Sequence, residues 1–270
     1  MDLKINMESI LDFYREADIV EEGIPKYEWN DINDNDSSDF RGLTNEEIQK
    51  YKYSYTIGLD KLKKIEQELN LGGTSRKYKF AEDDGDDMSY DRYIEGLPCM
   101  KKRFRTHGNG NGKFITLYVS ICENCWCNSK QLLNRAYTAM RIVDYLEDKG
   151  YRTKIVAYAD NEDPGYIQKN GQFEKINTLS VEVVIKNFEE PLIKGQVLTA
   201  ISPWFFRYWM FKFWNAKFRM NSGYGHSYNR KVNENKANVY IQTGEALTPE
   251  GSEKTIKRIQ KLFEIEEEEN

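Results

Sequence analysis

FITLYVSI (residues 114–121), SKQLLNRAYTAMRIVDYLEDK (129–149) and TKIVAYA (153–159) follow one another in the chain and decide its fold. The first and third segments are apolar runs rich in β-branched and aromatic residues, which is typical of buried strands. The middle segment carries one helical stripe of apolar residues: Leu132, Leu133, Ala136, Ala139, Met140, Val143 and Leu146. We expect Ser129 to cap this helix and Gly150 to end it. A crossover of this length makes the two strands parallel neighbours in one sheet, with a right-handed connection.

The C-terminal half extends this unit. Residues 161–177 are interpreted as a loop, because Pro164-Gly165 and Asn170-Gly171 are turn signals. The strand that follows, residues 179–186, leaves no room for a crossover helix, so we place it antiparallel at the sheet edge. Further predicted elements are helices over 192–202, 204–214 and 252–264 and a strand over 237–243. The fold class is α/β, a three-layer sandwich with a mostly parallel central sheet and one antiparallel edge strand.

The chain divides by pattern into two regions. Residues 1–80 are predicted to form a helical N-terminal region, with helices over 8–16 and 44–71. The second of these helices begins with the order Thr44-x-x-Glu47, which is a capping box. Residues 81–270 form the predicted α/β core domain, which ends in a solvated acidic tail.

Composition excludes several classes of protein. The net charge is −5 and the isoelectric point is near 5.4, which argues against broad binding to nucleic acid or to anionic membranes. Aromatic residues reach 13%, enough large apolar surface for a folded core. Neither a signal-peptide pattern nor an apolar run long enough to span a membrane is visible. We therefore expect a soluble, intracellular and cytoplasmic protein.

The order of elements resembles the von Willebrand factor A-like fold, in which the first strand leads into a metal-ion-dependent adhesion loop and the third strand is antiparallel. The adhesion motif of that family reads Asp-x-Ser-x-Ser. The matching positions here are Ser120, Cys122 and Asn124, so the defining aspartate is missing. Without a carboxylate at these positions, a hard divalent cation lacks its anionic oxygen ligand. The resemblance therefore implies the fold but not the metal site.

Four segments also resemble an uncharacterised protein family of tailed phages and prophages. They are GLPCM (96–100), NRAYTA (134–139), LEDKGYRTKIVAYA (146–159) and SPWFFR (202–207), and the similarity covers roughly residues 80–220. This resemblance implies a phage-encoded protein that works in the cytoplasm of the host cell. It implies no activity.

All four cysteines of the chain are candidate metal ligands. Cys122, Cys125 and Cys127 lie within six residues, and Cys99 stands alone upstream. Four thiolates suit a tetrahedral zinc ion or an iron–sulfur cluster. The Cys-x-x-Cys spacing also suits a redox pair at the start of a helix, and small buried cysteines are common packing residues. The sequence leaves these three interpretations open, with no cofactor as the first expectation and zinc as the alternative.

Two segments are candidate partner-binding surfaces. The first is the loop at the carboxyl end of the first core strand, where open parallel sheets bind their ligands. Its candidate residues are Ser120, Cys122, Glu123, Asn124, Trp126 and Asn128. The second is the aromatic helix over residues 204–218, which contains Arg207. A helix apolar on all sides is either buried between layers or completes an interface with a partner.

We expect a non-enzymatic module for protein–protein interaction. No paired carboxylates and no Ser-His-Asp set stand out in the sequence. The expected partner is a host factor or a phage-encoded protein such as an AAA+ ATPase, which is an inference from the fold alone. The basic cluster KKRFR (101–105) is more typical of a solvated strand edge than of a nucleic-acid site. The alternative function is a zinc, iron–sulfur or thiol-redox protein that uses the cysteines.

Overall fold

A computed structural model gives the fold of the chain. It describes residues 1–21, 41–56, 58–59, 78–82, 87–88, 93–94, 96–103, 114–123, 127–220, 230, 232, 235 and 237–264.

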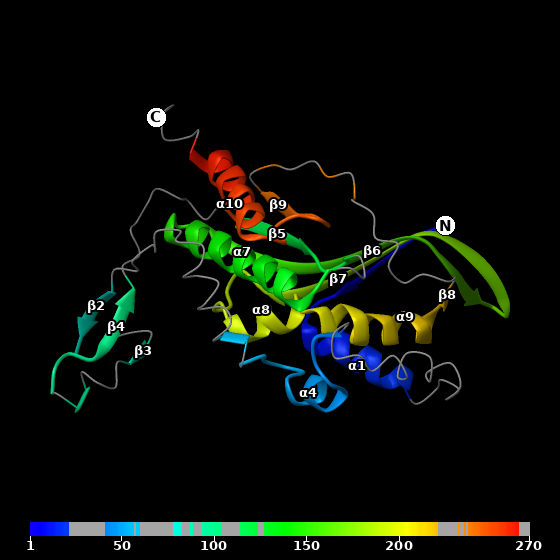
Figure 1. Ribbon diagram of the computed structural model, residues 1–270, viewed down its shortest axis with the longest axis horizontal. Helices are drawn as coiled ribbons and strands as arrows, with labels where there is room; N and C mark the ends of the chain where they lie inside the picture. Colours follow the sequence, from blue (N-terminus) through cyan, green and yellow to red (C-terminus); the bar gives the residue numbers. More distant parts are fainter. Residues whose placement is uncertain are drawn as a thin grey trace.

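One mixed, mostly parallel sheet forms the centre of the molecule (Figure 1). Its strands lie in the order β1 (Asp2–Met7), β7 (Gln172–Lys186), β6 (Arg152–Lys169), β5 (Phe114–Ser120) and β9 (Asn238–Ile241), and β8 (Arg219–Met220) pairs with β6. The pairs β1–β7, β5–β6 and β5–β9 are parallel, whereas β6 is antiparallel to β7 and to β8. The predicted parallel neighbours β5 and β6 are therefore confirmed, as is the α/β class.

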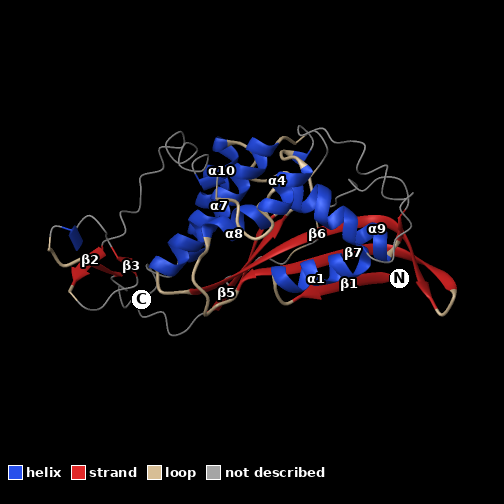
Figure 2. Ribbon diagram, turned by 90° about the horizontal axis from the view of Figure 1, so that it is seen from below, coloured by secondary structure: helices blue, strands red, loops and turns tan. Residues whose placement is uncertain are grey.

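The helices cover one face of this sheet, as Figure 2 shows. They are α1 (Ile10–Glu21), α4 (Asn45–Lys50), α7 (Ser129–Asp148), α8 (Lys194–Ala200), the π-helix η1 (Phe205–Met210), α9 (Phe211–Lys217) and α10 (Pro249–Glu264). Of these, α7 contacts β5 and β6, α8 contacts β7, and α1 contacts β1 and β7. Within the described ranges the molecule is a two-layer α/β sandwich.

The second helical layer that we predicted is not found among the described residues. The side chains of β5 explain the difference. Ile115, Leu117 and Val119 are buried beneath the helices, whereas Thr116 and Tyr118 point to the opposite face and are half-buried. Threonine and tyrosine favour strands as strongly as valine does. The segment over 114–121 therefore looked like a strand covered on both faces, whereas the described helices cover only one face.

We predicted that the antiparallel strand β7 would lie at the sheet edge, and this is wrong. Strand β1 pairs with its outer side, so β7 lies inside the sheet. The sequence of β1, DLKINM, places Leu3, Ile5 and Met7 toward the helices and polar residues on the other face. This alternation is the signature of a half-buried strand. The region predicted to be helical thus begins with a strand of the core sheet. The proposed division at residue 80 stays a prediction.

The predicted loop over 161–177 is instead a long hairpin. Strands β6 and β7 continue to Lys169 and Gln172, and Asn170-Gly171 alone forms the turn. Both turn residues have positive φ, 50° and 79°, as a two-residue hairpin turn requires. The other predicted turn lies inside β6 as a bulge, where the register shifts between Glu162 and Gly165. In Figure 1 the hairpin extends well beyond the helices.

Helix boundaries follow local capping chemistry. Helix α7 begins at Ser129, but its N-cap is Asn128 rather than the predicted Ser129. The Asn128 side chain accepts a hydrogen bond from the backbone N–H of Gln131 at 3.0 Å. Gly150, at φ 87°, follows its end as predicted. Helix α4 has the predicted Thr44–Glu47 capping box and ends at Lys50, so the longer helix predicted to residue 71 is wrong in its described part.

The aromatic segment forms the densest part of the core. The predicted helix over 204–214 is present as η1 followed by α9, and its side chains from 204 to 214 are all buried. Ring centroids of Phe13 and Phe205 lie 4.9 Å apart, and those of Tyr14 and Trp209 lie 5.0 Å apart. These contacts hold α1 against η1. This packing favours the interpretation that the helix is buried between other elements of the chain.

A separate small sheet consists of β2 (Tyr78–Ala81), β4 (Met100–Arg103) and β3 (Asp87–Met88), all antiparallel. The predicted acidic tail over 266–270 lies outside the described residues. Across the helices described here, none has the length and apolar character needed to cross a membrane.

The hairpin turn provides a test of the fold. We expect Gly171→Ala to lower the free energy of unfolding by about 1 kcal/mol, because alanine is strained at positive φ. The matched control is Asn170→Gly, which relieves a positive φ at the neighbouring position and is expected to be neutral or stabilising. Urea denaturation measures both. Equal stability of Gly171→Ala and wild type would contradict this turn geometry.

Candidate functional site

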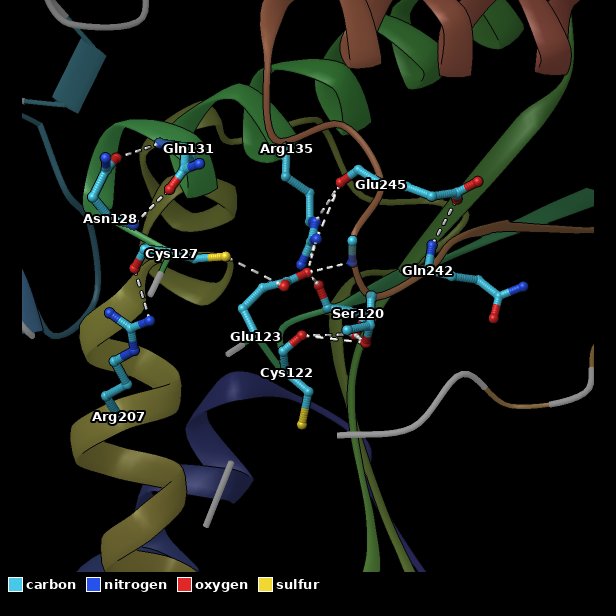
Figure 3. A network of polar contacts seen from close by, with 12 residues as sticks. Ser120, Cys122, Glu123, Cys127, Asn128, Gln131, Arg135, Arg207, Gln242 and Glu245 are labelled. Carbon is cyan, nitrogen blue, oxygen red and sulfur yellow. Dashed lines mark hydrogen bonds and ion pairs between the residues drawn. The ribbon is translucent and has the colours of Figure 1, made fainter. Parts of the chain in front are cut away.

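The guanidinium of Arg135 joins the carboxyl ends of β5 and β9 (Figure 3). Arg135 comes from the first half of α7, and its side chain is fully buried. It donates to the carbonyl oxygen of Ser120 at 2.8 Å, and to that of Glu245 from Nε at 3.1 Å and from Nη2 at 3.0 Å. It also forms an ion pair with Glu123. Parallel strands end at the same edge of a sheet, so one side chain can reach both loops.

Glu123 completes this joint from the other side. Its side chain is only 4% exposed. Besides Arg135, its carboxylate accepts a hydrogen bond from the Gly244 amide at 2.7 Å and one from the Cys127 thiol at 3.5 Å. A buried charge is stable only when paired and hydrogen-bonded, and this carboxylate is both. The β5–α7 loop (residues 120–128) is therefore fixed to the loop that follows β9.

Hydroxyl groups add a second contact between these loops. The Ser120 and Thr243 side-chain oxygens lie 2.8 Å apart, and both also approach the Cys122 carbonyl oxygen, at 3.4 Å and 3.2 Å. Among the described residues, the partners of the Ser120 hydroxyl are the Thr243 hydroxyl and the Cys122 carbonyl oxygen. These contacts position the described end of the loop.

The environment of Cys122 and Cys127 favours their protonated thiols. Cys122 is buried and donates to the Asp160 carbonyl oxygen at 3.4 Å. Burial, and then the charge of Asp160, raises the pKa of the Cys122 thiol well above its usual value. Partial burial, and then the charge of Glu123, raises the pKa of Cys127. Nucleophilic and redox-active thiols need a lowered pKa, so this environment does not favour the redox interpretation.

The metal-ligand hypothesis gains no support from the described residues. Cys99, Cys122 and Cys127 are free thiols, and Cys125 lies outside the described residues. In the part of the chain that the structure describes, no three His, Cys, Asp or Glu side chains gather as a metal site. A zinc or iron–sulfur site stays a prediction.

The predicted partner-binding residues fall into three groups. Buried in the described structure are Ser120, Cys122, Glu123 and Arg207. Asn128 is exposed, where it caps α7. Asn124 and Trp126 lie outside the described residues. The buried side chains hold the loop in place, so among the described members only Asn128 is available for direct contact with a partner.

Arg207 links the loop to the aromatic core. It lies in η1, is buried, and donates to the Cys127 carbonyl oxygen at 2.8 Å. The sequence placed Arg207 among the partner-binding residues, but its observed contact is within the chain. Figure 3 shows it reaching up from η1 to the loop. The β5–α7 loop is thus supported from below by η1 and from the side by Arg135.

Sequence reasoning missed a second polar surface, on the sheet face that the described helices leave uncovered. We call it the open face, and it consists of the outward side chains of β1, β7, β6, β5 and β9. Along β6 these side chains, Val156, Tyr158 and Asp160, are buried, whereas Thr116, Tyr118 and Tyr240 on the neighbouring strands are half-buried. Near its β9 edge, Tyr118 of β5 and Tyr240 of β9 stack, with ring centroids 4.9 Å apart and planes 11° apart. Both rings are half-buried. The signal was present in the sequence, because Thr116/Tyr118 and Asn238/Tyr240 occupy the same alternate positions of two strands.

Arg230 makes the main charged contacts on this face. It donates to both oxygens of Asp160 at 2.6 Å and to Glu182 at 2.7 Å, and it lies 4.0 Å above the Tyr158 ring. Burial opposes its charge, but the hydrogen bonds and charges of Asp160 and Glu182 outweigh this effect and raise the pKa of Arg230. Lys4 pairs with Glu182 at 3.0 Å. The two cations and two carboxylates balance, so the open face carries no large excess charge here.

The tyrosines of the open face stay neutral. Partial burial, followed by the charge of Glu182, raises the pKa of Tyr118. The pKa of Tyr240 is raised by partial burial and then by Tyr118. These rings present an apolar surface with neutral hydroxyl groups, which suits contact with another molecule.

The buried ion pair yields a stability test. We expect Arg135→Met to lower the free energy of unfolding by about 3–5 kcal/mol, because it leaves the Glu123 carboxylate buried without its cation. The matched control is Arg152→Met, which breaks the exposed Arg152–Glu189 pair and is expected to cost about 0–1 kcal/mol. Thermal and urea unfolding measure both. Equal losses in the two variants would show that the Arg135 pair is not the buried joint described above.

The Cys122 thiol yields a pH test. Its pKa is raised in the folded state, so its contribution to stability is complete below the pKa of an unfolded thiol, about 8.5, and is lost as the pH rises above it. We expect the stability of wild type relative to Cys122→Ala to fall between about pH 7 and about pH 10. Native Cys122 should also resist iodoacetamide, as peptide mapping would show. A constant stability difference across this range, or rapid alkylation, would contradict the buried, protonated thiol.

The comparisons with known proteins give a family and no function. No curated protein and no solved structure matches this chain. A family model described as "Domain of unknown function (DUF7192)" matches residues 2–267, nearly the whole sequence. The chain therefore belongs to the DUF7192 family.

Proposed function

We propose that this protein is a protein-binding module whose contact surface is the open face of the sheet. The observation that carries the proposal is the stacked, half-buried pair Tyr118–Tyr240 on β5 and β9, near one edge of that face. Tyrosine and arginine are enriched at the centres of protein interfaces, where large rings bury much area at a low entropic cost. The open face offers both, since Arg230 lies over the Tyr158 ring of the neighbouring strand β6.

The surroundings of the tyrosines suit a preformed interface. Arg230 donates hydrogen bonds to Asp160, Glu182 and Ser180, and Lys4 pairs with Glu182. Groups that are already hydrogen-bonded lose little freedom when a partner arrives, which lowers the entropic cost of binding. Aromatic rings next to paired polar groups are common in such contacts.

The β5–α7 loop adjoins this face and supports the same proposal. The Ser120 side chain lies on the side of β5 that carries Tyr118. The Arg135–Glu123 pair and the Arg207 contact fix the loop from inside. Among the described residues of this loop that we predicted to contact a partner, Asn128 is the exposed one. The proposed interface thus combines the open face with the outer side of the loop.

The identity of the partner rests on resemblance. The parallel β5–β6 pair and the antiparallel β7 agree with the von Willebrand A-like order, although the helices on one face and the added β1 depart from a three-layer sandwich. From that likeness we propose a phage-encoded partner of the AAA+ ATPase class, or a host protein. The similarity to the tailed-phage family supports a site of action in the cytoplasm of the infected cell.

Substitution of the two tyrosines tests the proposal. We expect Tyr118→Ser combined with Tyr240→Ser to weaken partner binding by roughly 10–100-fold, because it removes both stacked rings. The matched control is Tyr93→Ser, which removes an exposed tyrosine outside the sheet. The measurement is affinity capture with a C-terminal tag from the native host, with quantitative mass spectrometry.

Two outcomes count against the open face. One is unchanged retention of the partner by the tyrosine double variant. The other is an equal loss of the partner in the Tyr93→Ser control. A third variant, Asn128→Asp, adds a charge to the loop but keeps a residue that caps helices well. Loss of the partner in that variant alone would move the contact from the open face to the β5–α7 loop.

A further inference from the structure

Strand β1 forms an edge of the sheet that is open in the described structure. It pairs with β7 on one side, and the outward side chains Asp2, Lys4 and Asn6 are exposed. Its register with β7 is continuous from Asp2 to Met7, without a bulge, and the strand contains no proline. Bulges and prolines are the usual devices that keep an edge strand from pairing with another chain. This edge has neither.

The charged residues of β1 also fail to guard the edge. The Lys4 ammonium lies 3.0 Å from Glu182 of β7, and Asp2 accepts a hydrogen bond from the Thr178 hydroxyl, also of β7, at 2.9 Å. Both side chains lie over the face of the sheet rather than across the edge, and they stay exposed enough to meet side chains of an added strand. The backbone of β1 is left available to a further strand.

We propose that β1 pairs with the β1 of a second copy of this chain, antiparallel and about a two-fold axis, so that one sheet runs through a homodimer. Charge complementarity selects the occupant and the register. With Leu3 opposite Leu3 of the other copy, Asp2 lies opposite Lys4, and the two-fold axis makes this pair twice. Opposite charges in directly facing positions stabilise a strand pair.

The neighbouring register is disfavoured by the same rule. A shift of one residue in each copy places Lys4 opposite Lys4, and like charges that face each other destabilise the pair. In the favoured register the half-buried side chains of Leu3 and Ile5 gain new neighbours on the helix-facing side. Burial of this apolar surface adds to the backbone hydrogen bonds. Two-fold dimers of this kind are the commonest oligomers of soluble proteins.

The dimer has a structural consequence. The two-fold axis of an antiparallel strand pair is perpendicular to the sheet, so the helices of both copies lie on one side. Both open faces then lie on the other side and form one continuous surface. This inference does not depend on the proposed function, because β1 and the Tyr118–Tyr240 pair are separated by β7 and β6.

A charge-exchange experiment tests the proposal. Full-length protein with a C-terminal tag is expected to be a dimer in light scattering and native mass spectrometry. Asp2→Lys gives one variant positive at both positions, and Lys4→Asp gives one negative at both. Each alone is expected to be monomeric. Mixed in equal amounts, they are expected to form a heterodimer, because every facing pair then has opposite charges.

The mixing step is a control for misfolding, because two unfolded variants would not form a dimer. Circular dichroism tests whether each variant alone is folded. A monomeric wild type at all concentrations overturns the proposal. So do single variants that remain dimers, or folded single variants that fail to form the heterodimer. The tyrosine double variant of the open face should remain a dimer, which separates failure of this proposal from failure of the proposed function.

Discussion

The buried guanidinium of Arg135 makes the contacts on which the carboxyl edge of the sheet depends. It gathers the Ser120 and Glu245 carbonyl oxygens and the Glu123 carboxylate around one charge in the interior. A guanidinium presents several donors in a fixed plane, which allows one side chain to hold two loops at once. A lysine at this position would supply the charge but not the planar set of donors. Removal of either partner would leave the other charge buried and uncompensated.

A second constraint is the one-sided cover of the sheet. Helices α1, α7, α8, η1 and α9 bury one face, and the aromatic rings of α1 and η1 fill the space between them. The other face keeps half-buried tyrosines and a balanced group of charges that includes Arg230, Asp160 and Glu182. A sheet that is apolar on one face and polar on the other is stable in water.

The π-helix connects these two constraints. Helix η1 carries buried aromatic residues on most sides, and within it Arg207 reaches out of the aromatic layer to the Cys127 carbonyl oxygen. The wider winding of a π-helix changes the direction of its side chains relative to an ordinary helix, and such segments recur near functional loops. The loop at the end of β5 thus takes its shape from the core beneath it. A dimer through β1 would place two such assemblies in one sheet.

The sequence by itself determined the α/β class, the parallel β5–β6 pair and the helix between them, because the period of apolar residues changes from two to 3.6 within forty residues of chain. It also predicted the capping box at Thr44 and the glycine stop at Gly150, which depend on neighbours in sequence. It also predicted a site in the β5–α7 loop from strand direction alone, and this stays a prediction.

Only the tertiary structure decided what lies beside what. The place of β1 at the edge, the burial of Ser120, Cys122 and Glu123, and the bulge inside β6 all depend on residues far apart in the chain. The partners of Arg230 come from β6 and β7, 48 to 70 residues away. Local patterns report the conformation of a segment but not the identity of its distant neighbours, and those neighbours decide whether a polar side chain is buried as a joint or exposed as a binding residue.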